Sequence, residues 1–147
     1  MSVRGSVLLL AALLTGVACV SAMRTGTTRP PTELLGDFSD DYGSSYLVTA
    51  DAFQQDARAT YRVVAWHVDS QYLIAQNDSS NRSAPNRWTR IDWLTLRGMA
   101  PYTWGFCLSA YDAATQREAE AARVAQRESP RTGCNGFPFT RMRPRDR

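Results

Sequence analysis

Residues 61–76 read YRVVAWHVDSQYLIAQ, and this stretch decides the fold class. Residues 61–68 carry apolar or aromatic side chains on both sides of an extended chain: Tyr61, Val63 and Ala65 on one side, and Val64, Trp66 and Val68 on the other. Alternation with a period of two predicts a β-strand, and apolar side chains on both faces favour a central position. Asp69 and Ser70 separate this strand from residues 71–76, which indicates a tight antiparallel hairpin.

Four further strands are predicted on the two sides of this hairpin. Residues 36–42 and 46–50 precede it in the chain. Residues 77–86 are rich in Ser and Asn and are predicted to form a long loop. Two more strands follow at residues 88–96 and 102–108, which brings the predicted number of strands to six.

An alanine-rich segment after the last predicted strand favours a helix over residues 112–128. Asp112 can cap its first turn, and Thr115 and Glu118 have the spacing of a capping box. Pro130 is expected to end the helix. Only this one helix is predicted in the mature chain.

The fold class is therefore predicted to be mainly β. Short strands in series favour an antiparallel meander, and the six strands are expected to curl into a small barrel-like sheet so that their edges are protected. One C-terminal helix, at about residues 112–128, completes the predicted domain.

The N-terminus has the pattern of an export signal. A basic residue precedes an uncharged run at residues 5–17, whose apolar part is too short to span a bilayer. Residues 15–19 read TGVAC and resemble a bacterial lipobox, which implies a signal peptide at residues 1–18 and a membrane-anchoring lipid on Cys19. The alternative is a cut after residue 22 by ordinary signal peptidase, which would discard Cys19 and release a soluble secreted or periplasmic protein.

Composition divides the mature chain into three parts. The 4 Trp, 6 Tyr and 5 Phe all lie between Phe38 and Phe139, so a single β-rich domain is predicted at residues 36–140. Residues 19–35 are expected to form a flexible tether, and residues 141–147 a basic tail.

Cys107 and Cys134 remain as a pair whichever signal cut is used. In an oxidising compartment an even number of cysteines predicts a disulfide. The alternative is a pair of buried thiols.

The order of these elements resembles the lipocalin group of barrels over about residues 36–128. Residues 36–38 read GDF at the first strand, where that family has Gly-x-Trp, so Phe38 takes the place of the tryptophan. The lipocalins have eight strands where this sequence predicts six. The resemblance implies ligand binding inside the barrel.

The residues predicted to bind such a ligand are Trp66, Trp88, Arg90, Asp92 and Trp104. Arg90 and Asp92 share one face of a strand, so they can pair inside the barrel or bind a polar ligand, and a surface ion pair is the alternative. The tryptophans suit an apolar ligand, and they also suit a packed core.

Catalytic and metal chemistry have little support in the sequence. His67 is the single histidine, which argues against histidine-based metal sites, and a half-buried structural histidine is expected there. A hydrolase built on His67 and an aspartate is the remaining enzymatic hypothesis. No cofactor is predicted. Nucleic acid is disfavoured because the chain carries an export signal and residues 36–128 contain nine Arg against twelve Asp and Glu.

Residues 40–43, 104–107 and 132–137 also resemble segments of small, uncharacterised exported bacterial lipoproteins, a likeness that implies no activity. Together these features predict a lipid-anchored protein of the bacterial cell envelope. Its expected role is non-enzymatic binding of an apolar or amphiphilic ligand. The alternative role is that of a structural or accessory subunit bound to other envelope proteins.

Overall fold

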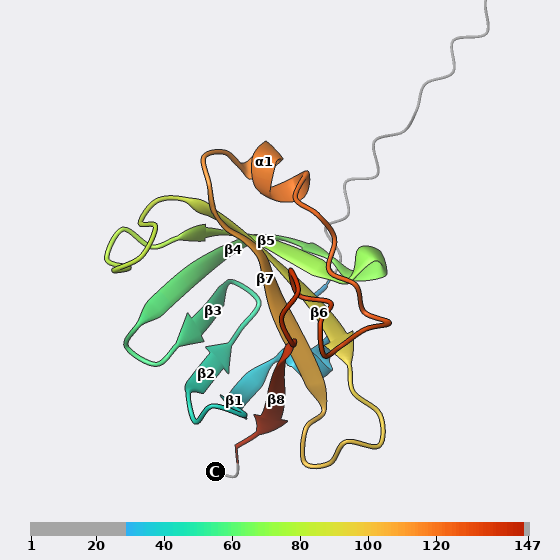
Figure 1. Ribbon diagram of the computed structural model, residues 1–147. Coiled ribbons are helices and arrows are strands. Elements are labelled where there is room, and N and C mark those ends of the chain that lie inside the picture. Colours follow the sequence, from blue (N-terminus) through green and yellow to red (C-terminus); the bar gives the residue numbers. More distant parts are fainter. Residues whose placement is uncertain (1–28, 146–147) are drawn as a thin grey trace, which may run out of the picture.

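The computed structural model describes residues 29–145 and shows a closed barrel of eight antiparallel strands (Figure 1). The strands are β1 (Gly36–Asp40), β2 (Ser45–Val48), β3 (Ala52–Gln55), β4 (Ala59–His67), β5 (Tyr72–Asn77), β6 (Trp88–Thr95), β7 (Trp104–Ala113) and β8 (Thr140–Pro144). Each strand pairs with its neighbours along the chain, and β8 returns to pair with β1. The predicted signal peptide and Cys19 lie outside the described residues.

Pairing of β1 with β8 closes the barrel. Phe38 lies opposite Pro144, and Asp40 lies opposite Met142. The backbone N–H of Arg145 donates a hydrogen bond of 2.9 Å to the carbonyl oxygen of Asp37, which extends the contact beyond β8. A closed sheet satisfies the backbone groups of its first and last strands, which would otherwise form exposed edges.

The predicted hairpin over residues 61–76 is confirmed as the antiparallel pair β4 and β5. The pairing register shifts between Val63 and Ala65, which marks a β-bulge. This extra residue changes which alternate side chains face inward, so Tyr61 and Trp66 both contact the barrel core although they differ in parity. Val64 on the opposite face is 48% exposed.

The predicted six strands become eight because two short strands carry few apolar residues. In β3 the only bulky apolar side chain is Phe53, and in β8 it is Met142, yet both are buried in the barrel. Residues 141–144 had been expected in a basic tail, and they form most of β8 instead. Met142 lies between two arginines, so the sequence of this strand shows no alternation of several apolar residues.

A short 3₁₀ helix, η1 (Thr32–Leu34), precedes β1 in a segment that was expected to be part of the tether. Leu34 is only 3% exposed and packs in the barrel core. The folded domain therefore begins before residue 36. Within residues 29–145 no helix is long and apolar enough to span a membrane.

The predicted helix at residues 112–128 is much shorter in the structure. Strand β7 continues to Ala113, and the helix α1 covers only Gln116–Glu120. The predicted cap at Thr115 is confirmed, since its hydroxyl accepts from the backbone N–H of Glu118. The return bond of the capping box is displaced by one residue, because the Glu118 carboxylate accepts from the N–H of Ala114 and not from that of Thr115. Good local helix signals therefore produced a single turn, which lies against the outside of β5, β6 and β7 (Figure 1).

The segment between α1 and β8 lies on the outer wall of the barrel, where the predicted disulfide holds it. Cys107 on β7 and Cys134 are bonded, with a Cα–Cα distance of 5.4 Å. A small outer cluster of apolar side chains surrounds this bond: Leu94, Cys107, Ala125 and Phe139. The disulfide and this cluster fix a segment that has little regular secondary structure.

The main hydrophobic core fills the inside of the barrel. Seven of its buried members are aromatic: Phe38, Tyr46, Phe53, Trp66, Trp93, Trp104 and Phe106. Several rings meet edge to face, for example Phe53 and Phe106 with centroids 5.1 Å apart. The alternation of inward and outward residues on each strand delivers these side chains to one space.

Candidate ligand site at the rim of the barrel

Two of the five predicted binding residues, Trp66 and Trp104, lie inside the barrel. Trp66 is 6% and Trp104 is 3% exposed. The indole N–H of Trp66 donates a hydrogen bond of 2.8 Å to the carbonyl oxygen of Ala50. The indole nitrogen of Trp104 is buried and has no hydrogen-bond partner among the described residues.

The space between these tryptophans is almost completely filled. The cavity inside the barrel has a volume of only about 10 Å³. Its lining is apolar and comes from the main core: Leu34, Val48, Phe53, Trp66, Leu73, Ile91, Trp93 and Trp104. A water molecule needs at least about 10–15 Å³, so this part of the barrel has no room for an organic ligand.

Arg90 and Asp92 share a strand face as predicted, but that face is the outer wall of the barrel. The Arg90 guanidinium donates to the Asp92 carboxylate at 2.8 and 3.1 Å. The hydroxyl of Ser109 and the guanidinium of Arg127 donate to the same carboxylate. Both predicted residues are nevertheless buried, at 3% and 0% exposure, because the segment between α1 and β8 covers them. They form neither a pair inside the barrel nor an open surface pair.

This buried network joins the covering segment to the barrel. Arg127 also donates to the carbonyl oxygens of Trp93, Ser70 and Gln71, and Arg90 donates to that of Glu120. The guanidinium groups of Arg90 and Arg127 therefore already donate their hydrogen bonds to acceptors within the protein. The network is therefore suited to holding the covering segment in place.

Trp88, the fifth predicted residue, is half-buried at the start of β6 and lies opposite Ala113 of β7. The structure thus places the five residues in three environments. It brings Arg90 together with Asp92, and it places Trp66 and Trp104 in the core.

His67 lies against the ring of Tyr72, with ring centroids 4.3 Å apart in a stacked arrangement. The Arg90 guanidinium carbon is 3.8 Å from the centroid of the same tyrosine. Nε2 of His67 is buried without a hydrogen-bond partner among the described residues. Within residues 29–145 His67 forms no hydrogen bond to an aspartate or a hydroxyl group, so the structure provides no assembled nucleophile and base around it. No group of three or more metal-ligating side chains occurs in the same range.

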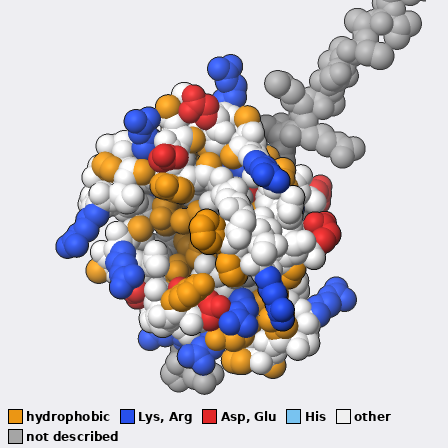
Figure 2. Space-filling model, viewed as in Figure 1, with side chains coloured by type: hydrophobic (Ala, Val, Ile, Leu, Met, Phe, Trp, Pro, Cys, Tyr) orange, Lys and Arg blue, Asp and Glu red, His pale blue; other side chains and the backbone are white. Residues whose placement is uncertain are grey.

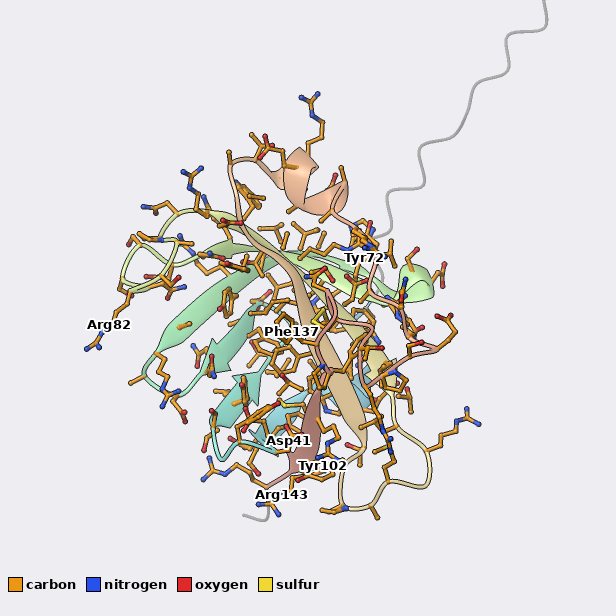
Figure 3. All side chains as sticks on the ribbon, in the orientation of Figure 1. Asp41, Tyr72, Arg82, Tyr102, Phe137 and Arg143 are labelled. Atoms are coloured by element: carbon orange, nitrogen blue, oxygen red, sulfur yellow. A yellow bond between two sulfur atoms is a disulfide. The ribbon has the colours of Figure 1, made fainter. Side chains whose placement is uncertain are left out.

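A pocket of about 710 Å³ lies at the rim of the barrel. We call it the rim pocket and define it by its lining residues: Gln55, Asp56, Ala57, Arg58, Ala59, Tyr61, Arg82 and Ser83. The β3–β4 hairpin and the start of β4 supply one wall, and the loop between β5 and β6 supplies the other. In Figure 3 Arg82 extends from that loop at the edge of the barrel, on the side of the hairpin.

Strand alternation directs the inner wall of the rim pocket toward the barrel core. Gln55 has the same parity as the buried Phe53, and Ala59 the same parity as Tyr61. The ring centroids of Phe53 and Tyr61 are 6.2 Å apart, so the tyrosine that lines the pocket also packs against the aromatic core. Figure 2 shows hydrophobic side chains in a hollow in the middle of this face, between the positions of β3 and β7 in Figure 1.

Internal hydrogen bonds hold the outer wall of the rim pocket. The side-chain oxygen of Asn81 accepts from the backbone N–H of Thr60, and its amide donates to the Thr60 carbonyl, both at 2.9 Å. The amide of Asn77 donates to the carbonyl oxygens of Ala84 and Tyr111. These bonds fix the loop that presents Arg82, although its composition indicated only a long loop.

Sequence reasoning did not identify the rim pocket because its residues come from two separate turns. Asp56 adopts a positive φ of 45° in the tight β3–β4 turn, a strand pair that the alternation pattern did not reveal. Arg58 and Arg82 are exposed arginines, and neither lies in a sequence pattern that indicates ligand binding. Only the pairing of β3 with β4 would have indicated that Arg58 and Arg82 lie at the same pocket.

A second hollow of about 380 Å³ lies beside the β1–β2 turn. Apolar side chains and one ion pair line it, including Tyr42, Met99, Phe139 and the pair Asp41–Arg141, which are 2.8 Å apart. Two exposed aromatic residues stand out on the surface: Tyr42 at 73% and Phe137 at 71% exposure. Figure 3 shows Phe137 at the front of this face.

The comparisons with known proteins find no match to this chain, neither among family models nor among curated proteins or solved structures.

Proposed function

We propose that this chain is an exported, lipid-anchored module of the bacterial cell envelope that binds an amphiphilic small molecule at the rim pocket without transforming it. The single observation that carries the binding role is a pocket of about 710 Å³ that adjoins the aromatic core and is edged by charged groups. Sites for organic ligands are usually concave, with apolar walls and a few placed polar groups. The anchoring role rests on the lipobox-like sequence that ends at Cys19.

The proposed ligand lies across the rim and does not thread through the barrel. Tyr61, Ala57 and Ala59 offer apolar contact, while Arg58 and Arg82 stand at the edge. The packed core below, with its cavity of about 10 Å³, leaves no deeper position for the ligand. An amphiphile fits this arrangement better than a purely apolar molecule because the lining combines the ring of Tyr61 and two alanines with charged and polar side chains.

The experiment that tests this role measures uptake of the neutral hydrophobic probe N-phenyl-naphthylamine. The protein is the full-length chain with Cys19→Ser, which removes the predicted lipidation site. Ala59→Phe fills the pocket from its inner wall and is expected to weaken probe binding about tenfold. The matched control is Ala114→Phe, because Ala114 is exposed and lies outside the rim pocket. Thermal unfolding shows that both variants remain folded.

The proposal fails if the purified protein neither retains a ligand nor takes up the probe. It also fails if Ala59→Phe and Ala114→Phe bind the probe as well as the parent chain. A second filling variant, Ser83→Trp, acts from the opposite wall and serves if Ala59→Phe does not fold.

A second candidate function, that of an accessory subunit, is favoured by the exposed Phe137 and Tyr42. Exposed aromatic side chains are enriched in protein interfaces. Residues 102–106 give no such support, because Trp104 and Phe106 are buried. A photo-crosslinker at position 137 tests this role. It should capture a defined envelope protein that the same crosslinker at position 124, also exposed, does not capture.

A further inference from the structure

Hydrogen-bond donors outnumber acceptors among the side chains of the rim pocket. The guanidinium groups of Arg58 and Arg82 form no hydrogen bond or ion pair with residues 29–145, and Gln55, Tyr61 and Ser83 add further polar groups. The only carboxylate in the lining is that of Asp56. One of its oxygens already accepts a hydrogen bond of 3.0 Å from the backbone N–H of Ser45.

The charges of these donors are stable at physiological pH. A guanidinium group is always protonated in proteins, and its planar fork matches the two oxygens of a carboxylate, phosphate or sulfonate. Burial raises the pKa of Tyr61 above its usual value of 10.0, so its hydroxyl keeps its proton. The lining therefore contains two permanent cations, a neutral phenol and one carboxylate that is partly engaged.

The walls that carry the two arginines are ordered before a ligand binds. Asn81 ties the loop of Arg82 to Thr60 through two hydrogen bonds of 2.9 Å. The backbone N–H of Arg58 donates a hydrogen bond of 3.0 Å to the carbonyl oxygen of Gln55, which closes the hairpin turn. Anchoring both backbones in this way lowers the entropic cost of gathering two cations around one anion.

The closed barrel restricts the apolar part of the ligand. A long chain directed inward would need space between Phe53 and Trp66, where the cavity is about 10 Å³. The ligand must therefore fit within the rim pocket itself. A compact ring system or a short chain meets this requirement.

We propose, resting on the ligand-binding role above, that the rim pocket selects compact amphiphiles with an anionic head group. Arg58 and Arg82 bind the head group, and Tyr61 contacts the apolar body. The acidic group is a carboxylate, phosphate or sulfonate, which share the oxygen geometry that the two guanidinium groups recognise.

Two probes with the same aromatic body test this selection. Anilinonaphthalene sulfonate carries a sulfonate on the skeleton of the neutral N-phenyl-naphthylamine. Titration calorimetry on the full-length Cys19→Ser chain measures the affinity and stoichiometry of each. We expect one sulfonate probe per chain, bound about tenfold more tightly than the neutral probe, with an affinity that falls as salt is added.

The double variant Arg58→Gln/Arg82→Gln removes both cations from the pocket. It should bring the affinity for the sulfonate probe down to that of the neutral probe and leave the neutral probe unchanged. Arg123→Gln and Arg117→Gln together form the matched control, because both residues are exposed and lie outside the lining. This control removes the same net charge and should leave both affinities unchanged.

The outcomes separate the two proposals. Equal binding of both probes by the parent chain, with no effect of Arg58→Gln/Arg82→Gln, overturns the anionic selection and leaves the binding role intact. An equal loss of affinity for the sulfonate probe in the control variant also overturns the selection. The effect would then come from the net charge of the protein and not from the two arginines of the pocket. Failure of both probes to bind overturns the binding role and the selection with it.

Discussion

The carboxylate of Asp92 accepts a hydrogen bond of 2.9 Å from the guanidinium of Arg127, and this contact joins the barrel wall to the segment that covers it. Asp92 is fully buried, while the side chain of Arg127 is 20% exposed. Arg90 and Ser109 satisfy the rest of the carboxylate. A buried charge of this kind is tolerated because each of its oxygens meets a donor.

Asp92→Ala is expected to destabilise the domain by about 3–5 kcal/mol, because it leaves the buried Arg90 guanidinium without its counter-charge. The measurement is the free energy of unfolding in urea. Asp41→Ala is the control, since its partner Arg141 is 42% exposed, and it should cause a clearly smaller loss. Similar losses of unfolding free energy in the two variants would show that the buried Asp92 network stabilises the domain no more than an exposed ion pair does.

Removal of the disulfide is expected to loosen the same covering segment. Cys107 and Cys134 are 27 residues apart, and closing a loop of that size contributes about 3.6 kcal/mol in the chain-entropy model. The double variant Cys107→Ala/Cys134→Ala should lose up to this amount. Hydrogen exchange should also become faster at the N–H groups of Gln126 and Phe139, which are bonded within the segment. Unchanged stability together with unchanged exchange would contradict this role.

Most strands predicted from sequence contain several apolar side chains, with β1 and its single Phe38 as the exception, and each missed strand buries only one. The alternation in β4 is strong enough to predict the hairpin with β5, although the bulge near Val64 changes the inward parity. Strands β3 and β8 contribute only Phe53 and Met142 to the core. Barrel closure supplies their partners, and single-sequence periodicity contains no information on that closure.

The site was harder to predict than the fold. The disulfide followed from cysteine parity, whereas the position of Asp92 depends on which face of β6 lies inside. Alternation places Arg90 and Asp92 on one face of this strand, but it does not show that another segment of the chain buries that face too. The covering segment buries the outer face of β6, so polar residues on that face are as little exposed as residues of the hydrophobic core.

Alkaline pH is expected to destabilise the domain through Tyr46. Burial and the hydrogen bond of 2.9 Å to Asp40 raise the pKa of Tyr46 far above its usual 10.0. Below pH 10 the phenol is protonated in both the folded and the unfolded chain, so its contribution to stability is complete. Above that value the unfolded chain ionises first, and each further pH unit removes about 1.4 kcal/mol.

Tyr46→Phe removes this titration and should flatten the alkaline part of the stability curve by about 1.4 kcal/mol per pH unit, whatever its effect at neutral pH. Urea unfolding at several values from pH 8 upward measures both slopes. Tyr111→Phe is the control, because Tyr111 is 52% exposed. Parallel curves for the parent chain and Tyr46→Phe would exclude this tyrosine as the cause.

Phe53→Ala is expected to open the barrel beneath the rim pocket. Phe53 is 2% exposed and contacts the rings of Tyr46, Tyr61 and Phe106. Its truncation should cost about 3–5 kcal/mol, whereas Val64→Ala on the outer face should change stability little. The same variant should gain affinity for amphiphiles with longer chains, measured by calorimetry. A destabilised variant without that gain would mean that the surrounding side chains collapse into the space.

The last prediction concerns Cys19, which the lipobox-like sequence assigns as the anchored N-terminus. The intact mass of the membrane fraction, taken under denaturing and non-reducing conditions, should match a chain that starts at Cys19, carries lipid and lacks two protons. Cys19→Ser should move the protein to the soluble fraction, while the disulfide mass difference stays. A chain that starts at Met23 in both cases would contradict the anchor. The rim pocket would then belong to a protein released from the membrane.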